Sequence, residues 1–176
     1  MSGHNKWSKI KHKKAATDSA RGKVFTRLVR LIQVEAKLAG GNVDSPGLKA
    51  AIEKAHKENM PKDNIERAIK KASEAGDMSP VMSEVYGPAG IGLIVTALTD
   101  NNNRTSAEIK HLVDKQGASF GAQGSVSWNF TKNKETGDWD ANTTMDLEDA
   151  DLDKLGRLVE AIEEHDDVQD VFTNAS

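Results

Sequence analysis

Helical periodicity shapes the first third of the chain. Between Ser19 and Leu38, apolar residues recur near every 3.6 positions while the basic residues fall largely elsewhere, which predicts an amphipathic helix with one buried face. Gly40 and Gly41 follow and end that helix, because glycine readily adopts the backbone conformation that terminates helices. The apolar positions are Val24, Phe25, Leu28, Leu31, Ile32 and Leu38.

Two further helices are predicted before residue 78. The first starts at Asp44-Ser45-Pro46, where a capping residue precedes a proline suited to the first turn, and it ends near Asn59. The second starts at about residue 62, with Asp63 and Glu66 at capping-box spacing. Connections this short favour a compact three-helix domain over residues 18–78, preceded by a basic arm over residues 1–17.

Strand signals replace helical ones from Ser83 onward. Residues 85–86 and 91–98 are rich in strand-forming residues and flank a Gly-Pro-Ala-Gly turn, which predicts a hairpin. A second domain therefore begins here.

A helix and a strand follow the hairpin. Thr105 and Glu108 are spaced as a capping box for a helix that stops at Gly117. Alternation over residues 125–130 predicts a strand. The residues that share one face of this strand are Val126, Trp128 and Phe130.

The last part of the chain repeats this order. Residues 131–142 are polar and predict a loop, and a short strand at 143–147 precedes a helix around residues 152–162 and a final strand at 168–172. The order is broadly β-α-β, β-α-β with one extra N-terminal strand. The simplest packing is an α+β fold, in which a ferredoxin-like, split βαβ domain occupies residues 79–176.

Composition excludes several classes of protein. The chain has no cysteine, which rules out disulfides and thiolate metal sites and fits a reducing compartment such as the cytoplasm. No apolar run approaches the ~18 residues that span a bilayer, and the basic N-terminus lacks the apolar core of a secretory signal. We therefore expect a cytoplasmic protein without membrane contact.

Charge divides the chain into two opposite parts. Residues 1–75 hold 17 Lys and Arg against 8 Asp and Glu, a net charge of +9, whereas residues 76–176 hold 7 against 19, a net charge of −12. Such asymmetry indicates contact of the basic part with nucleic acid or with a membrane.

The basic excess is densest near the N-terminus. Residues 3–23 contain seven Lys and Arg and one acid, Asp18, with Trp7 among the lysines. An indole can stack on a base while neighbouring ammonium groups meet phosphates, so nucleic-acid binding is the leading interpretation. A solvated surface, a targeting segment and docking of the arm on the acidic second domain are the alternatives.

No catalytic constellation is present in the sequence. Glu108 and His111 form one Glu-x-x-His pair, which is half of a dinuclear metal motif, and residues 87–92 match neither phosphate-loop pattern. We expect no enzyme activity, metal, cofactor or small-molecule substrate. The five histidines are scattered and are His4, His12, His56, His111 and His165.

Five segments of the chain resemble, in order, the signature segments of the YebC/PmpR family. The segments are GHNKWSKIKHKKAATDSARGKVFTRLVRLI, ENMPKDNIERAIKKA, YGPAGIGLIVTALTDNNNRTSAEIKH, GSVSWNF and DDVQDVFTNA. The family includes bacterial proteins described as transcriptional regulators and the mitochondrial translational activator of cytochrome c oxidase subunit I.

The resemblance implies a three-helix domain followed by α+β domains, no catalysis, and regulation of gene expression through nucleic acid. Carried over to this chain, it implies a DNA-binding surface on the arm, the first helix and the start of the third helix. The residues are His4, Lys6, Trp7, Lys9, Lys11, His12, Lys13, Lys14, Arg21, Lys23, Arg27, Arg30, Lys62 and Arg67. The acidic domain would face away from the bound polyanion.

One departure from the family and two alternative functions accompany this expectation. Typical members carry a further α+β domain where residues 131–142 form only a linker here, which implies a short form of the family.

The first alternative function is a ribosome-associated factor that binds rRNA and relieves stalling, since an irregular RNA suits Trp7 and a flexible arm. The second is a protein-interaction module with a basic partner.

Overall fold

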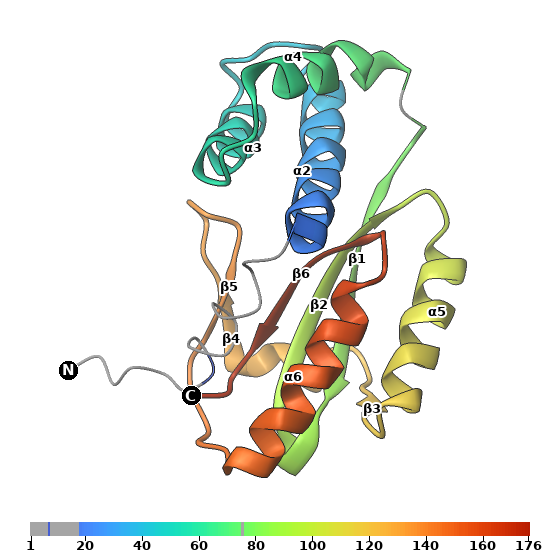
Figure 1. The fold of residues 1–176 in the computed structure, drawn as a ribbon, viewed down its shortest axis with the longest axis vertical. Helices are drawn as coiled ribbons and strands as arrows, with labels where there is room; N and C mark the ends of the chain where they lie inside the picture. The colour runs from blue at the N-terminus through green and yellow to red at the C-terminus, as the bar shows by residue number, and fades with distance from the viewer. Residues whose placement is uncertain (1–6, 8–17, 75) are drawn as a thin grey trace, which may run out of the picture.

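The three helices predicted before residue 78 form, with small changes at their ends. The computed structural model describes Trp7, residues 18–74 and residues 76–176, and places the three helices at one end of the molecule (Figure 1). The helices are α2 (Asp18–Leu38), α3 (Pro46–Lys57) and α4 (Lys62–Lys70), followed by the 3₁₀ turn η1 (Lys71–Ser73). Gly40 and Gly41 take positive φ angles of 59° and 82° at the end of α2, where L side chains would be strained.

The apolar faces of these helices form a core of their own. Leu28, Ile32 and Leu48 are buried in this core, and alanines at half of its buried positions let the helices approach closely. The predicted capping box of α4 is wrong, because Pro61 occupies the cap position and no side chain caps the helix. The proline supplies the extended backbone that precedes a helix, so Asp63 lies within the first turn instead.

The second domain is an α+β layer built on one four-stranded sheet. Its strands lie in the order β3 (Ser119–Phe120), β1 (Ser79–Tyr86), β2 (Gly92–Thr99) and β6 (Val168–Thr173), and all neighbouring pairs are antiparallel. Strands β2 and β3 are therefore parallel, joined by α5 (Asn102–Lys115), with β1 between them. This is the predicted split βαβ unit, although the intervening strand precedes the unit in the chain.

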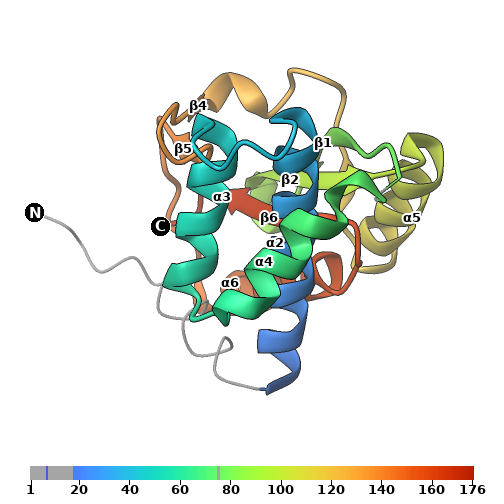
Figure 2. The same ribbon diagram turned by 90° about the horizontal axis from the view of Figure 1, so that it is seen from above.

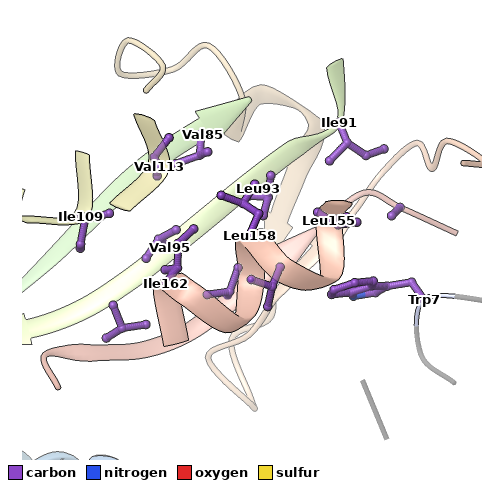
Figure 3. Packing of buried hydrophobic residues seen from close by; sticks show 14 of the residues in the cluster. Trp7, Val85, Ile91, Leu93, Val95, Ile109, Val113, Leu155, Leu158 and Ile162 are labelled. Atoms are coloured by element: carbon purple, nitrogen blue, oxygen red, sulfur yellow. The ribbon is translucent and has the colours of Figure 1, made fainter. Parts of the chain in front are cut away.

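The two faces of the sheet are covered differently. Helices α5 and α6 (Asp149–Glu163) pack on one face, where Leu155, Leu158 and Ile162 of α6 meet Leu93 and Val95 of β2 (Figure 3). The other face carries a smaller cluster around Ile94, covered by the hairpin of β4 (Phe130–Lys132) and β5 (Trp139–Ala141).

Three sequence predictions for the second domain are wrong. The loop predicted over residues 131–142 contains most of the β4–β5 hairpin, and the strand predicted over 143–147 is one isolated bridge between Met145 and Ala175. The helix α5 begins earlier than its predicted capping box, and Asn101 caps it by accepting a hydrogen bond from the backbone N–H of Arg104. Short polar strands are hard to predict because their pairing depends on a partner distant in sequence.

The strand predicted over residues 125–130 is also wrong for most of its length. Residues 127–129 form the 3₁₀ turn η3, and only Phe130 begins a strand. Val126 and Phe130 are buried, whereas Trp128 is 75% exposed. The alternation of apolar residues was real, but the backbone turns between them.

Trp7 is buried in the core of the second domain. Its side chain is 8% exposed, it belongs to the same cluster as Leu155 and Leu158, and it lies beside α6 (Figure 3). The predicted role of this indole in stacking on a base is therefore wrong for the structure described here, because a ring packed against α6 does not present its faces to solvent.

Trp7→Ala should destabilise the protein by about 3 kcal/mol, since a buried indole would be replaced by a cavity. Trp7→Phe should retain most of the stability. Urea unfolding followed by circular dichroism measures both values, and Leu38→Ala, at a position 78% exposed, serves as the control. A Trp7→Ala protein as stable as the control would contradict the burial.

Candidate nucleic-acid interface

Helix α2 turns part of its basic face toward the acidic second domain. Arg30 Nη1 lies 2.5 Å from Asp167 Oδ1, and Lys23 Nζ lies 4.0 Å from Glu164 Oε1. Arg27 donates a hydrogen bond to the backbone carbonyl of Glu163, at the end of α6. Guanidinium groups suit this position because the last carbonyls of a helix lack intrahelical donors and carry partial negative charge.

Asp167 is the centre of this contact. The residue is 6% exposed, and its carboxylate accepts from Arg30 of α2 as well as from two residues of α5. Arg104 Nη2 lies 3.2 Å and the Thr105 hydroxyl 2.7 Å from Asp167 Oδ2. Although burial raises the pKa of Asp167, the bonds from Thr105, Arg30 and Arg104 outweigh it and lower the pKa to about 2.

A histidine joins the same turn to α5. His165 Nε2 lies 2.7 Å from Glu108 Oε2, while the backbone N–H of Asp167 donates to His165 Nδ1. The sequence pairs Glu108 with His111, but the fold brings it to His165 instead. The acidic segment 163–167 is thus a contact surface for α2 and α5 rather than a solvated helix end.

Three cations of the predicted interface contact the acidic second domain. They are Lys23, Arg27 and Arg30 of α2. The docking alternative concerned the arm over residues 1–17, of which the structure describes Trp7. The expectation that the acidic domain faces away from these residues is wrong. The physical reason is proximity: α2 packs where α6 ends, so the nearest carboxylates neutralise its cations first.

The other predicted residues divide into two groups. Arg21, Lys62 and Arg67 are exposed. Lys62 Nζ lies 3.5 Å from Glu66 Oε1, one turn away, and Arg67 donates to Asn64 Oδ1 at 2.5 Å. Seven of the predicted residues lie outside the described part of the chain. They are His4, Lys6, Lys9, Lys11, His12, Lys13 and Lys14.

Further cations on the three-helix domain were missed by the sequence analysis. Lys49 and Lys57 of α3, Lys70 of α4 and Lys71 of η1 are exposed and point away from the domain core. The signal was available, because these positions lie opposite the buried stripe of the same amphipathic helices. Exposed acids are interspersed among them, namely Glu53, Glu58, Asp63, Glu66 and Glu74.

A second contact connects the two domains through the β4–β5 hairpin. Lys54 Nζ of α3 lies 3.4 Å from Asp138 Oδ1, next to the first residue of β5. Figure 2 shows α3 on the side of the molecule where β4 and β5 lie, with α5 on the opposite side. The three-helix domain therefore meets the sheet domain at two separate places.

The described residues contain neither a metal-binding cluster nor a membrane-spanning helix. Across Trp7, residues 18–74 and residues 76–176, no group of three or more His, Asp or Glu side chains is arranged to hold a metal ion. Within the same ranges no helix combines the length and apolar character needed to cross a bilayer.

Both parts of the chain match profiles of one protein family. Residues 5–75 match the profile described as TACO1/YebC protein N-terminal domain, and residues 78–136 and 133–175 match the one described as TACO1/YebC second and third domain. The chain belongs to the TACO1/YebC family. The two segments of the second match meet in the β4–β5 hairpin, and the absence of an inserted domain from this TACO1/YebC chain stays a prediction.

Known relatives and a solved structure agree with this assignment. A probable transcriptional regulatory protein of Desulforapulum autotrophicum is 46% identical over 84% of this chain and 64% of its own length. One of Thermotoga maritima is 44% identical over 98% of this chain and 70% of its own length. The chain thus spans about two thirds of these relatives.

The structural neighbour supports the fold. The crystal structure of a conserved hypothetical protein from Aquifex aeolicus has a TM-score of 0.79 and 32% identity, and the alignment covers 96% of this chain and 95% of that chain. The α+β architecture inferred from the sequence is therefore confirmed.

Asp167→Asn should weaken the contact between the domains. Because the folded pKa is about 2 against an ordinary 3.8, the ionised carboxylate contributes stability above pH 3.8 that disappears as the pH falls toward 2. The contribution is about 2 kcal/mol at pH 7. Urea unfolding should show this loss for the variant at pH 7, and a smaller change in stability between pH 4 and pH 2.

The matched control for this prediction is Asp77→Asn. Asp77 Oδ1 lies 2.7 Å from Lys37 Nζ, but the Asp77 side chain is 97% exposed. This ion pair should therefore contribute much less to the stability of the protein. Equal effects of the two substitutions would contradict the central role of Asp167.

Proposed function

We propose that this protein is a non-enzymatic regulator of gene expression that binds nucleic acid through its basic N-terminal part. The proposed nucleic acid is DNA. The observation that carries the proposal is the division of charge, +9 over residues 1–75 and −12 over residues 76–176. A polyanion such as DNA is attracted by the first part and repelled by the second, which orients the protein on it.

The contacts between the domains involve only some of the positively charged residues. Lys23, Arg27, Arg30 and Lys54 contact the second domain, and the exposed cations of α3, α4 and η1 remain accessible to phosphates. Salt bridges between exposed groups, such as Lys62 with Glu66, are weak and can yield to a phosphate.

The relatives support the regulatory part of the proposal. Several carry the name probable transcriptional regulatory protein and match most of this chain. Phosphate contacts of this kind position a protein on DNA without reading its sequence. The proposal therefore concerns binding to the sugar-phosphate backbone, and it includes no catalytic step.

Replacing both Lys62 and Arg67 by alanine should weaken binding to a duplex DNA oligonucleotide. If each contacts one phosphate, the slope of log affinity against log salt should become shallower by about 0.9 per residue, because fewer counterions are released. Fluorescence anisotropy of a labelled duplex, recorded at salt concentrations between about 50 and 200 mM, measures this slope.

Lys154→Ala is the control, because Lys154 is an exposed lysine on α6 of the acidic domain and should not contact the duplex. An unmodified protein whose affinity does not depend on salt would overturn the proposal. Tighter binding to structured RNA than to duplex DNA would indicate that the bound nucleic acid is RNA.

A further inference from the structure

The connection between β3 and β4 is built around a buried carboxylate. Glu84 of β1 is 3% exposed, and its Oε1 accepts from the backbone N–H of Gly124 at 2.6 Å. Its Oε2 accepts from the backbone N–H groups of Val126 at 2.6 Å and Ser127 at 2.7 Å. Burial raises the pKa of Glu84, but these N–H groups outweigh it and hold the pKa below its ordinary value. The loop is thereby fixed to the sheet as an ordered turn.

The ordered turn presents an aromatic ring to solvent. Trp128 is 75% exposed, and its indole N–H donates to the backbone carbonyl of Ser125 at 2.9 Å. The hydroxyl of Tyr86, on β1, donates to the same carbonyl at 2.9 Å. The polar edge of the indole is thus satisfied within the protein, and what remains available is its apolar ring.

The exposed ring contributes little to the stability of the fold. Val126 and Phe130, on either side of η3, are buried and supply the packing of this segment against Ile94. A large aromatic side chain left in water gains none of the free energy that burial would give it. Tryptophan is enriched at interfaces because it combines a large apolar ring with one polar group.

The stretch of chain that contains the ring differs in charge from the rest of the second domain. Residues 115–134 contain three lysines and no Asp or Glu, although residues 76–176 carry 19 acids against 7 bases. Lys132 and Lys134 are exposed and follow Trp128 by four and six residues. Of the three acids of the hairpin, Asp138 contacts Lys54, whereas Glu135 and Asp140 are exposed.

We infer that Trp128 is a stacking platform for an unpaired base of single-stranded nucleic acid, and that the exposed lysines which follow it in the chain, Lys132 and Lys134, contribute attraction to the phosphate backbone. This inference rests on the proposed function only in assuming that the ligand is a nucleic acid, because it concerns a different surface. A flat ring with satisfied polar atoms accepts the face of any base, and nearby ammonium groups neutralise the backbone.

A base fits these features better than an apolar protein segment does. The loop residues next to Trp128 in the chain are small or polar, namely Gln123, Gly124, Ser125, Ser127 and Asn129, and Tyr86, which bonds the same carbonyl, is only 37% exposed. A protein hot spot instead relies on a desolvated ring of neighbouring contacts. The structure therefore assigns to the second domain a contact that distinguishes single strands from duplexes, whose bases are already stacked.

The test compares the full-length protein with Trp128→Ala and Trp128→Phe. The probes are a fluorescein-labelled deoxythymidine dodecamer and a labelled duplex of the same length, both followed by anisotropy at fixed salt. Loss of one stacked base should weaken binding of the dodecamer by roughly 5- to 150-fold in Trp128→Ala, while Trp128→Phe stays within about threefold of the unmodified protein. Binding of the duplex should not change.

The outcomes separate this inference from the proposed function. Leu38→Ala removes an equally exposed apolar side chain from the three-helix domain and should leave both affinities unchanged. Unchanged dodecamer affinity in Trp128→Ala, or equal losses on dodecamer and duplex, would overturn the stacking platform while leaving the proposed function intact. Failure of the unmodified protein to bind either probe would overturn both. Circular dichroism of each variant verifies that the fold is retained.

Discussion

The bond between Arg30 and Asp167 is the interaction on which the relation of the two domains depends. It joins α2 to the start of β6, and Asp167 also accepts from Arg104 and Thr105, so one carboxylate connects three elements. A buried carboxylate needs several donors to remain ionised, and here the donors come from parts of the chain more than sixty residues away. The contact thus couples the folding of the second domain to the position of α2.

The elements that sequence predicted well are those whose signals are local. The stripe from Val24 to Leu38 and the glycines after it determine α2, since each apolar residue lies within one or two turns of the next. The same holds for α6 and β2, whereas β1 begins at Ser79, six residues before the predicted strand at 85–86. Residues 125–130 were misread because burial of Val126 and Phe130 produces the same alternation in a turn as in a strand.

The candidate interface was predictable in its charge but not in its geometry. Composition located the positive charge in residues 1–75, yet it could not show that Arg27 and Arg30 meet the end of α6, because that contact depends on how the domains pack. Trp7 illustrates the same limit. An indole among lysines resembles a base-stacking residue, but its apolar area gains more free energy when it packs against α6.

The β4–β5 hairpin gives this architecture a place where the chain can change length. Phe130 and Ala141 are paired across the two strands, so the chain leaves and re-enters the domain at neighbouring points. Segments of very different size can be accommodated between such points while the four-stranded sheet keeps its register, since the entropy of closing a loop grows slowly with loop length. The hairpin is thus a natural junction for engineered insertions, such as a reporter domain whose orientation follows the strands.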